Sequence, residues 1–135
     1  MRSNSKTSHP SIILYMMNIF FHLIHLAIVF FFLFGWLSSK TLLAHFLLSI
    51  LILFSWSGLG IFYGFGYCLV TDIQWKIKKR MGQEPYTEYY IKYMLDKLTG
   101  LDLNSHTVNA VTTYTFFIIL LMSTVLILNR QFSFF

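Results

Sequence analysis

Three long apolar runs constrain the fold of this 135-residue chain more than any other feature of its sequence. The first, residues 12–34, has no formally charged side chain at any position. As an α-helix it would extend about 34 Å, which is enough to cross a hydrocarbon core of about 30 Å. Two further runs, residues 42–70 and 108–128, are also long enough. The sequence therefore predicts an all-α integral membrane protein with three transmembrane helices, at about residues 12–34, 42–66 and 108–128.

Composition agrees with this prediction. Charged residues make up 11% of the chain and hydrophobic residues 56%, whereas about 25% of residues are charged in a soluble globular protein. The length predicts one membrane domain, residues 1–135. The net charge is +5, but the basic residues lie beside apolar runs. We therefore expect a bilayer with anionic headgroups as the partner of these charges, and not nucleic acid.

A polar segment separates the second and third runs. Residues 71–105 contain six of the ten basic residues and all five acidic ones, so this segment is too charged to span a bilayer. We expect two helices here, at about residues 72–81 and 86–99, lying in the cytoplasmic interface. Local signals support their ends: a possible capping box at Thr71 to Gln74, glycines at Gly82 and Gly100, and ion-pair spacing between Glu88 and Lys92.

The distribution of lysine and arginine predicts the orientation. With three spans, eight of these residues share the side of the N-terminus: Arg2, Lys6, Lys76, Lys78, Lys79, Arg80, Lys92 and Lys97. Lys40 and Arg130 lie on the other side. Because basic residues favour the cytoplasmic side, we expect an inner-membrane protein with its N-terminus in the cytoplasm and its C-terminus outside. The group of Lys76, Lys78, Lys79 and Arg80 is then expected to contact lipid headgroups.

Polar side chains within the first run are candidate functional residues. Asn18, His22 and His25 follow one another at spacings of four and three, so they share one helical face. Folding the first two runs as a hairpin places His22 at the depth of Ser55. The same hairpin places His45 opposite Phe32, about 10 Å along the axis from His25.

Three interpretations of His22 and His25 remain open. They can be buried hydrogen-bond partners that join helices, which is the usual role of such residues and the one we favour. They can form a proton or quinone site. They can also bind haem or a metal as cofactor-binding residues, although a third and a fourth ligand are not evident, and no metal site is assigned. We expect no cofactor, with haem as the alternative.

Small residues near the end of the second run suggest a helix-packing surface. Gly60, Gly64 and Cys68 are spaced four apart and would line one face of a continuous helix. Such a face lets a membrane protein partner, or a second copy of the chain, approach closely. Alternatively, the glycines only loosen the end of the span. Cys68 can be a thiol that the neighbouring cationic cluster makes reactive, or an acylated thiol at the membrane boundary. It can also be simply a small packing residue, with Asp72 as a first-turn helix charge, which is the interpretation we favour.

No common catalytic motif is present: the sequence lacks G-x-S-x-G, H-E-x-x-H, a Walker loop and G-x-G-x-x-G. No catalytic residue is therefore assigned, and the balance favours a protein that is not an enzyme. The leading hypothesis is a structural or accessory membrane component that acts through helix packing and a basic cytoplasmic surface. The alternative is a redox-linked or proton-linked membrane protein that uses His22 and His25.

The sequence resembles small bacterial membrane proteins of domain-of-unknown-function family 2784. The matching positions are His25, Trp36, Cys68, Thr71, Trp75, Gly82 and the run Tyr90-Ile91-Lys92-Tyr93. Leu69 and Val70 stand where the family pattern has proline and leucine, so the kink that proline imposes is missing. The resemblance implies the same helical membrane fold. With Asp72, the positions Cys68, Thr71 and Trp75 form a possible functional motif, but the family has no established activity to assign to them.

Overall fold

The computed structural model describes residues 11–133, and every regular element in this part of the chain is helical. Arg2 and Lys6, which the orientation count includes, lie outside the described residues. The elements are α1 (Ile12–Phe34), a 3₁₀ turn (Gly35–Leu37), α2 (Leu42–Phe54), a π-helical turn (Ser55–Leu59), α3 (Gly60–Tyr63), α4 (Leu69–Arg80), α5 (Tyr90–Thr99) and α6 (Ser105–Phe132).

Three helical segments in the described residues are long and apolar enough to cross a membrane, as the sequence predicts. They are Ile12–Leu37, Leu42–Tyr63 and Ser105–Phe132. Large apolar side chains cover their outer faces, with Ile12, Phe54 and Leu121 each more than 60% exposed. Such a surface is typical of helices that contact lipid.

The ends of the spans differ in part from the prediction. α1 begins at Ile12, where the Ser11 hydroxyl accepts a hydrogen bond from the Leu14 amide. The third span is longer than residues 108–128, because Asn104 caps it and accepts from the Thr107 amide at 3.0 Å. The second span is shorter than residues 42–66, since α3 ends at Tyr63.

The chain reverses sharply after α3, and glycines make this reversal possible. Gly64 adopts φ 103°, a conformation that side chains with a Cβ rarely adopt. A Cβ on Gly60 would lie 3.2 Å from the Phe65 Cα, so the returning backbone passes close to Gly60. The helix ends at Tyr63, and Cys68 is the N-cap of α4. Gly60, Gly64 and Cys68 therefore do not form a row along one helix, and the prediction of such a face is wrong.

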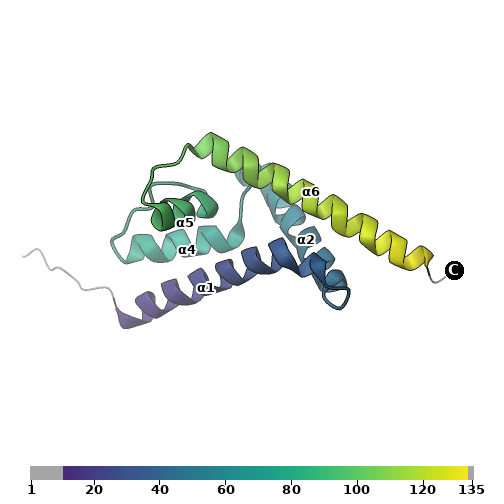
Figure 1. Cartoon of the computed structure of the whole chain (residues 1–135). Coiled ribbons are helices and arrows are strands. Elements are labelled where there is room, and N and C mark those ends of the chain that lie inside the picture. The colour runs from purple at the N-terminus through teal and green to yellow at the C-terminus, as the bar shows by residue number, and fades with distance from the viewer. Residues whose placement is uncertain (1–10, 134–135) are drawn as a thin grey trace, which may run out of the picture.

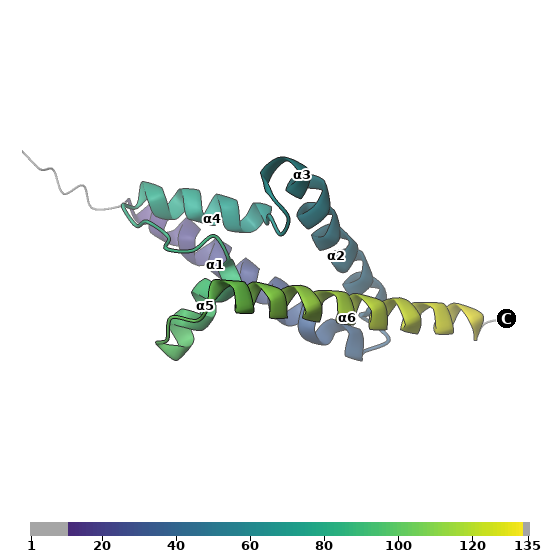
Figure 2. The ribbon, with the colours of Figure 1, turned by 90° about the horizontal axis from the view of Figure 1, so that it is seen from above.

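The helices form an open arrangement in which α1 and α2 diverge from their connecting turn (Figures 1 and 2). α4 lies beside the N-terminal half of α1, and α1 packs more extensively on α4 than on α2. The expected hairpin neighbour of His22, Ser55, instead donates a hydrogen bond to the Tyr67 carbonyl at 3.2 Å. α6 packs against both α2 and α5.

The apolar core lies where α1, α2 and α6 meet. Phe32 stacks on Phe116 at a centroid distance of 5.2 Å, and Ile119 completes the buried cluster. Trp56 packs on the same Phe116 ring, at 4.8 Å. This core is small, so the rest of α1 must be stabilised by other contacts, which α4 and α5 provide.

α4 and α5 occur where two helices are expected, with shifted beginnings. α4 begins three residues before the predicted position, so Thr71 is buried within its first turn and caps no helix. α5 begins at Tyr90, and not at residue 86. Their C-terminal ends follow the prediction, because Gly82 and Gly100 both adopt positive φ. α4 lies along the side of α1, and does not lie across the N-terminal end of α1 (Figure 1).

Candidate functional site

The contacts of His22 join α1 to α4 and α5. The Tyr90 hydroxyl lies 2.8 Å from His22 Nδ1, and Gln74 Nε2 lies 3.5 Å from the same atom. The Tyr90 hydroxyl and the Gln74 amide can both donate, so the His22 tautomer with its proton on Nε2 satisfies both contacts. One imidazole nitrogen therefore connects three helices that are far apart in the sequence.

His25 packs against the same tyrosine. Its ring stacks on the Tyr90 ring at a centroid distance of 3.6 Å, with the two planes 6° apart. Both residues are buried, with 7% of His25 and 3% of Tyr90 exposed. Burial, followed by the neighbouring Tyr93, raises the pKa of the Tyr90 hydroxyl. Tyr90 therefore keeps its proton and remains a hydrogen-bond donor at neutral pH.

Several buried polar atoms around these residues have no hydrogen-bond partner in the described part of the chain. They are Asn18 Oδ1, His25 Nδ1 and Gln74 Oε1. Gln74 has no exposed surface at all. Buried polar atoms are usually satisfied, so three unpartnered polar atoms in one region mark a place where a ligand or water can bind. We call Asn18, His22, His25, Gln74 and Tyr90 the polar cluster.

His45 lies apart from the polar cluster. Its Nε2 is 2.8 Å from the Phe32 carbonyl, which can only accept, so Nε2 carries the proton. The side chain is fully buried, and its Nδ1 has no partner among the described residues. The prediction that His45 lies opposite Phe32 is confirmed. The contact ties α1 to α2 close to their connecting turn.

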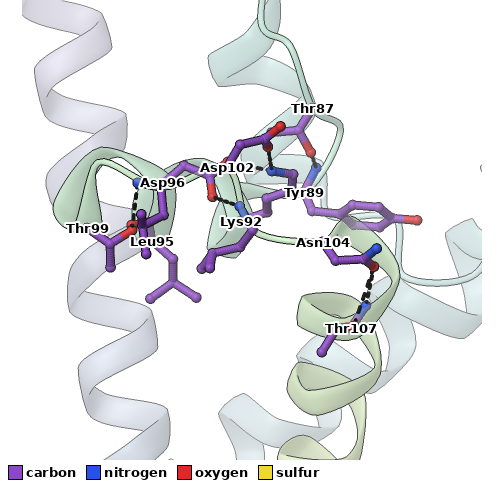
Figure 3. Close-up of polar contacts among 11 residues, drawn as sticks. Thr87, Tyr89, Lys92, Leu95, Asp96, Thr99, Asp102, Asn104 and Thr107 are labelled. Atoms are coloured by element: carbon purple, nitrogen blue, oxygen red, sulfur yellow. Dashed lines mark hydrogen bonds and ion pairs between the residues drawn. The ribbon is translucent and has the colours of Figure 1, made fainter.

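A second polar group joins α5 to the segment before α6 (Figure 3). Lys92 is 4% exposed and pairs with Asp96, and with Asp102 at 2.7 Å. Asp96 also accepts from the Leu103 amide at 2.9 Å. The sequence predicts a Glu88–Lys92 pair instead, which is wrong because Glu88 precedes the first turn of α5. We call Lys92, Asp96 and Asp102 the lysine clasp.

The pKa values of the lysine clasp reflect these ion pairs. Asp102 and then Asp96 raise the pKa of the Lys92 ammonium, since both carboxylates stabilise its charged form. Lys92 in turn holds the pKa of Asp96 below its ordinary value. Sequence analysis missed this group, although the spacing of Lys92 and Asp96 by four residues was a usable signal.

The residues of the possible functional motif do not converge on one site. Trp75 donates to the Thr87 carbonyl at 2.8 Å and packs edge-on against Tyr93. Asp72 pairs with Lys76 at 2.7 Å, and that ammonium lowers the pKa of its carboxyl group. Cys68 is half-buried at the start of α4. These side chains are spread around α4, each with its own neighbours.

The four basic residues assigned to lipid headgroups also separate. Lys76, Lys79 and Arg80 are exposed, and we call them the basic surface. Lys78, by contrast, is 7% exposed. It lies 4.9 Å from the centre of the Tyr93 ring and donates to Gln83 Oε1 at 3.4 Å. The expectation that all four face headgroups in the same way therefore fails for Lys78, because its side of α4 faces the other helices.

Comparison with known proteins identifies the family of this chain but assigns no activity to it. Neither a curated protein nor a solved structure matches the chain significantly. The model of one family, described as a protein of unknown function, DUF2784, matches residues 15–128. The match extends from the first span nearly to the end of the third, so the chain belongs to the DUF2784 family.

Proposed function

We propose that this chain is a multi-pass inner-membrane protein of structural or accessory type, which acts through helix packing and the basic surface. One observation carries the proposal: His22 and His25, the residues most suited to chemistry, contact Tyr90 at hydrogen-bond and stacking distance. Interhelical polar contacts of this kind stabilise membrane proteins by joining helices. In this proposal they attach α4 and α5 to the first span.

Attachment of α4 to α1 gives the basic surface a fixed position. Lys76, Lys79 and Arg80 occupy the C-terminal half of α4 and are exposed. A basic residue near an anionic membrane surface contributes about 1 kcal/mol of attraction. We propose that these side chains hold the cytoplasmic end of the protein against anionic headgroups. A membrane protein partner or a second copy would then pack against its apolar helices.

The orientation can be tested by thiol labelling in intact cells. The background is Cys68→Ser, which removes the one native cysteine. Glu84→Cys lies in the exposed segment between α4 and α5, and Ser39→Cys lies in the exposed turn between α1 and α2. We expect an impermeant maleimide to label Ser39→Cys in intact cells, and Glu84→Cys only after permeabilisation. Labelling with the opposite pattern would refute the proposed topology.

A second function, redox-linked or proton-linked, is favoured by one specific observation. His25 Nδ1 is buried and has no partner in the described residues, while the His25 ring touches Tyr90. Visible absorption spectra of the purified protein, oxidised and then reduced, separate the two functions. A band that shifts on reduction and disappears in His25→Ala would establish a bound redox group. A spectrum without such a band supports the packing role.

A further inference from the structure

Lys78 is a buried cation without a carboxylate partner in the described part of the chain. Its polar contacts are the neutral Gln83 amide and the face of the Tyr93 ring. Lys92 is buried to a similar degree but has two carboxylates beside it. Because burial of an unpaired charge is unfavourable, the surroundings of Lys78 are incomplete unless an anion binds there.

A cavity of about 180 Å³ adjoins Lys78, between α1, α4 and α5. Asn18 and His22 also line it, and Asn18 Oδ1 is one of the buried acceptors without a partner. A second cavity, of about 410 Å³, shares His22 and Tyr93 with the first. Lys97 lines this second cavity and lies 5.7 Å from the centre of the Tyr93 ring. The two ammonium groups therefore lie close to one aromatic ring, and among residues 11–133 no acidic side chain lines either cavity.

The remaining walls of both cavities are apolar. Ile19 and Leu23 line the first, and Leu26, Met94 and Leu98 line the second. Leu23 and Leu98 are 59% and 75% exposed, so the cavities open onto the outer apolar surface. A site with two cations, one unpartnered acceptor and an apolar exit suits a ligand with an anionic head and an apolar chain.

We propose that this cleft, lined by Asn18, His22, Lys78, Tyr93 and Lys97, binds one amphiphile that has a phosphate head. Lys78 binds the anion, Lys97 supplies a second positive charge, and Asn18 Oδ1 accepts a hydrogen bond from a hydroxyl group on the head. The apolar chain follows Leu23 and Leu98 to the surface. This inference goes beyond the proposed function, which requires no bound ligand.

The test is a binding titration of the full chain in a neutral detergent, with native mass spectrometry as the readout. The probes are phosphatidylglycerol, phosphatidylcholine and free glycerol phosphate, which separate a lipid from a soluble anion. We expect saturable binding of phosphatidylglycerol alone. Lys78→Gln should weaken this binding at least about tenfold, as expected for the loss of a charge-assisted hydrogen bond.

Lys40→Gln is the control, since it removes the same charge from an exposed position in the turn between α1 and α2, outside both cavities and outside the basic surface. It should change binding by less than about twofold, because an exposed charge in water interacts weakly. Lys78→Arg should retain binding and shows that the position tolerates substitution. If Lys78→Gln does not fold, Lys97→Gln takes its place and should weaken binding severalfold.

Three results would overturn the inference. These are the absence of saturable phosphatidylglycerol binding, equal losses in Lys78→Gln and Lys40→Gln, and equally tight binding of free glycerol phosphate. Failure here is distinguishable from failure of the proposed function, because thiol labelling in cells reports orientation and not ligand binding. A protein with the proposed topology that binds no amphiphile would contradict this inference alone.

Discussion

Replacement of Tyr90 by phenylalanine tests whether the polar cluster holds the helices together. Tyr90→Phe removes only the hydroxyl, which lies 2.8 Å from His22 Nδ1. The ring remains and can still stack on His25, at a centroid distance of 3.6 Å. The variant therefore isolates the hydrogen bond from the aromatic contact.

The expected magnitude follows from what remains around His22 in the variant. Its Nδ1 keeps only Gln74 Nε2, at 3.5 Å, a distance longer than the usual range of about 2.7–3.2 Å and therefore a weak contact. Leaving a buried acceptor without a partner costs about 1–3 kcal/mol. Because His22 is only half-buried, we expect the lower part of this range, about 1–2 kcal/mol, or about a five- to thirtyfold change in an opening equilibrium.

Amide hydrogen exchange in the full chain, in mild detergent, measures this opening. We expect exchange in α5 to accelerate by that factor in Tyr90→Phe, while exchange in α6 remains nearly unchanged. The matched control is Tyr114→Phe, because Tyr114 lies on α6 and is 69% exposed. In a His22→Ala background, the same Tyr90→Phe change should have little further effect. Equal exchange in Tyr90→Phe and the unmodified protein would refute the claim that His22 attaches α5 to α1.

Two further predictions concern the lysine clasp and the reversal after α3. Asp96→Asn should release the segment before α6 and accelerate exchange of the Leu103 amide, which Asp96 accepts from. Because the pKa of Asp96 is depressed, its contribution to stability is present above about pH 4 and is lost as the pH falls. Because the pKa of Lys92 is raised, its contribution to stability is lost only as the pH rises above about 10. A protection factor for the Leu103 amide that stays constant from pH 2 to 7, after correction for the intrinsic exchange rate, would contradict this assignment. Gly60→Ala should destabilise the protein by about 1–3 kcal/mol, because the added Cβ would lie 3.2 Å from a backbone atom. This loss of stability should appear as a lower midpoint temperature in thermal unfolding. Gly58→Ala, whose Cβ would lie 3.5 Å from an aromatic ring, is the control and should be tolerated.

The sequence by itself determined the features that depend on local composition and spacing. The three apolar spans follow from the length of uncharged sequence that a bilayer requires, and all three occur as helices. The ends of α4 and α5 follow from Gly82 and Gly100, because glycine readily adopts the positive φ needed there. The contact between His45 and Phe32 follows from a short connection, which leaves only one register between neighbouring residues.

Tertiary structure alone decided the pairings between distant segments. His22 and Tyr90 are 68 residues apart, and no periodicity in either segment shows that they meet. Lys78 and Lys79 are adjacent and have similar chemistry, yet one is buried and the other exposed. Which face of α4 turns inward depends on the direction in which the chain leaves Gly64. Helical spacing shows which residues share a face, but the partner of that face is chosen only when the chain reverses and α4 packs along α1.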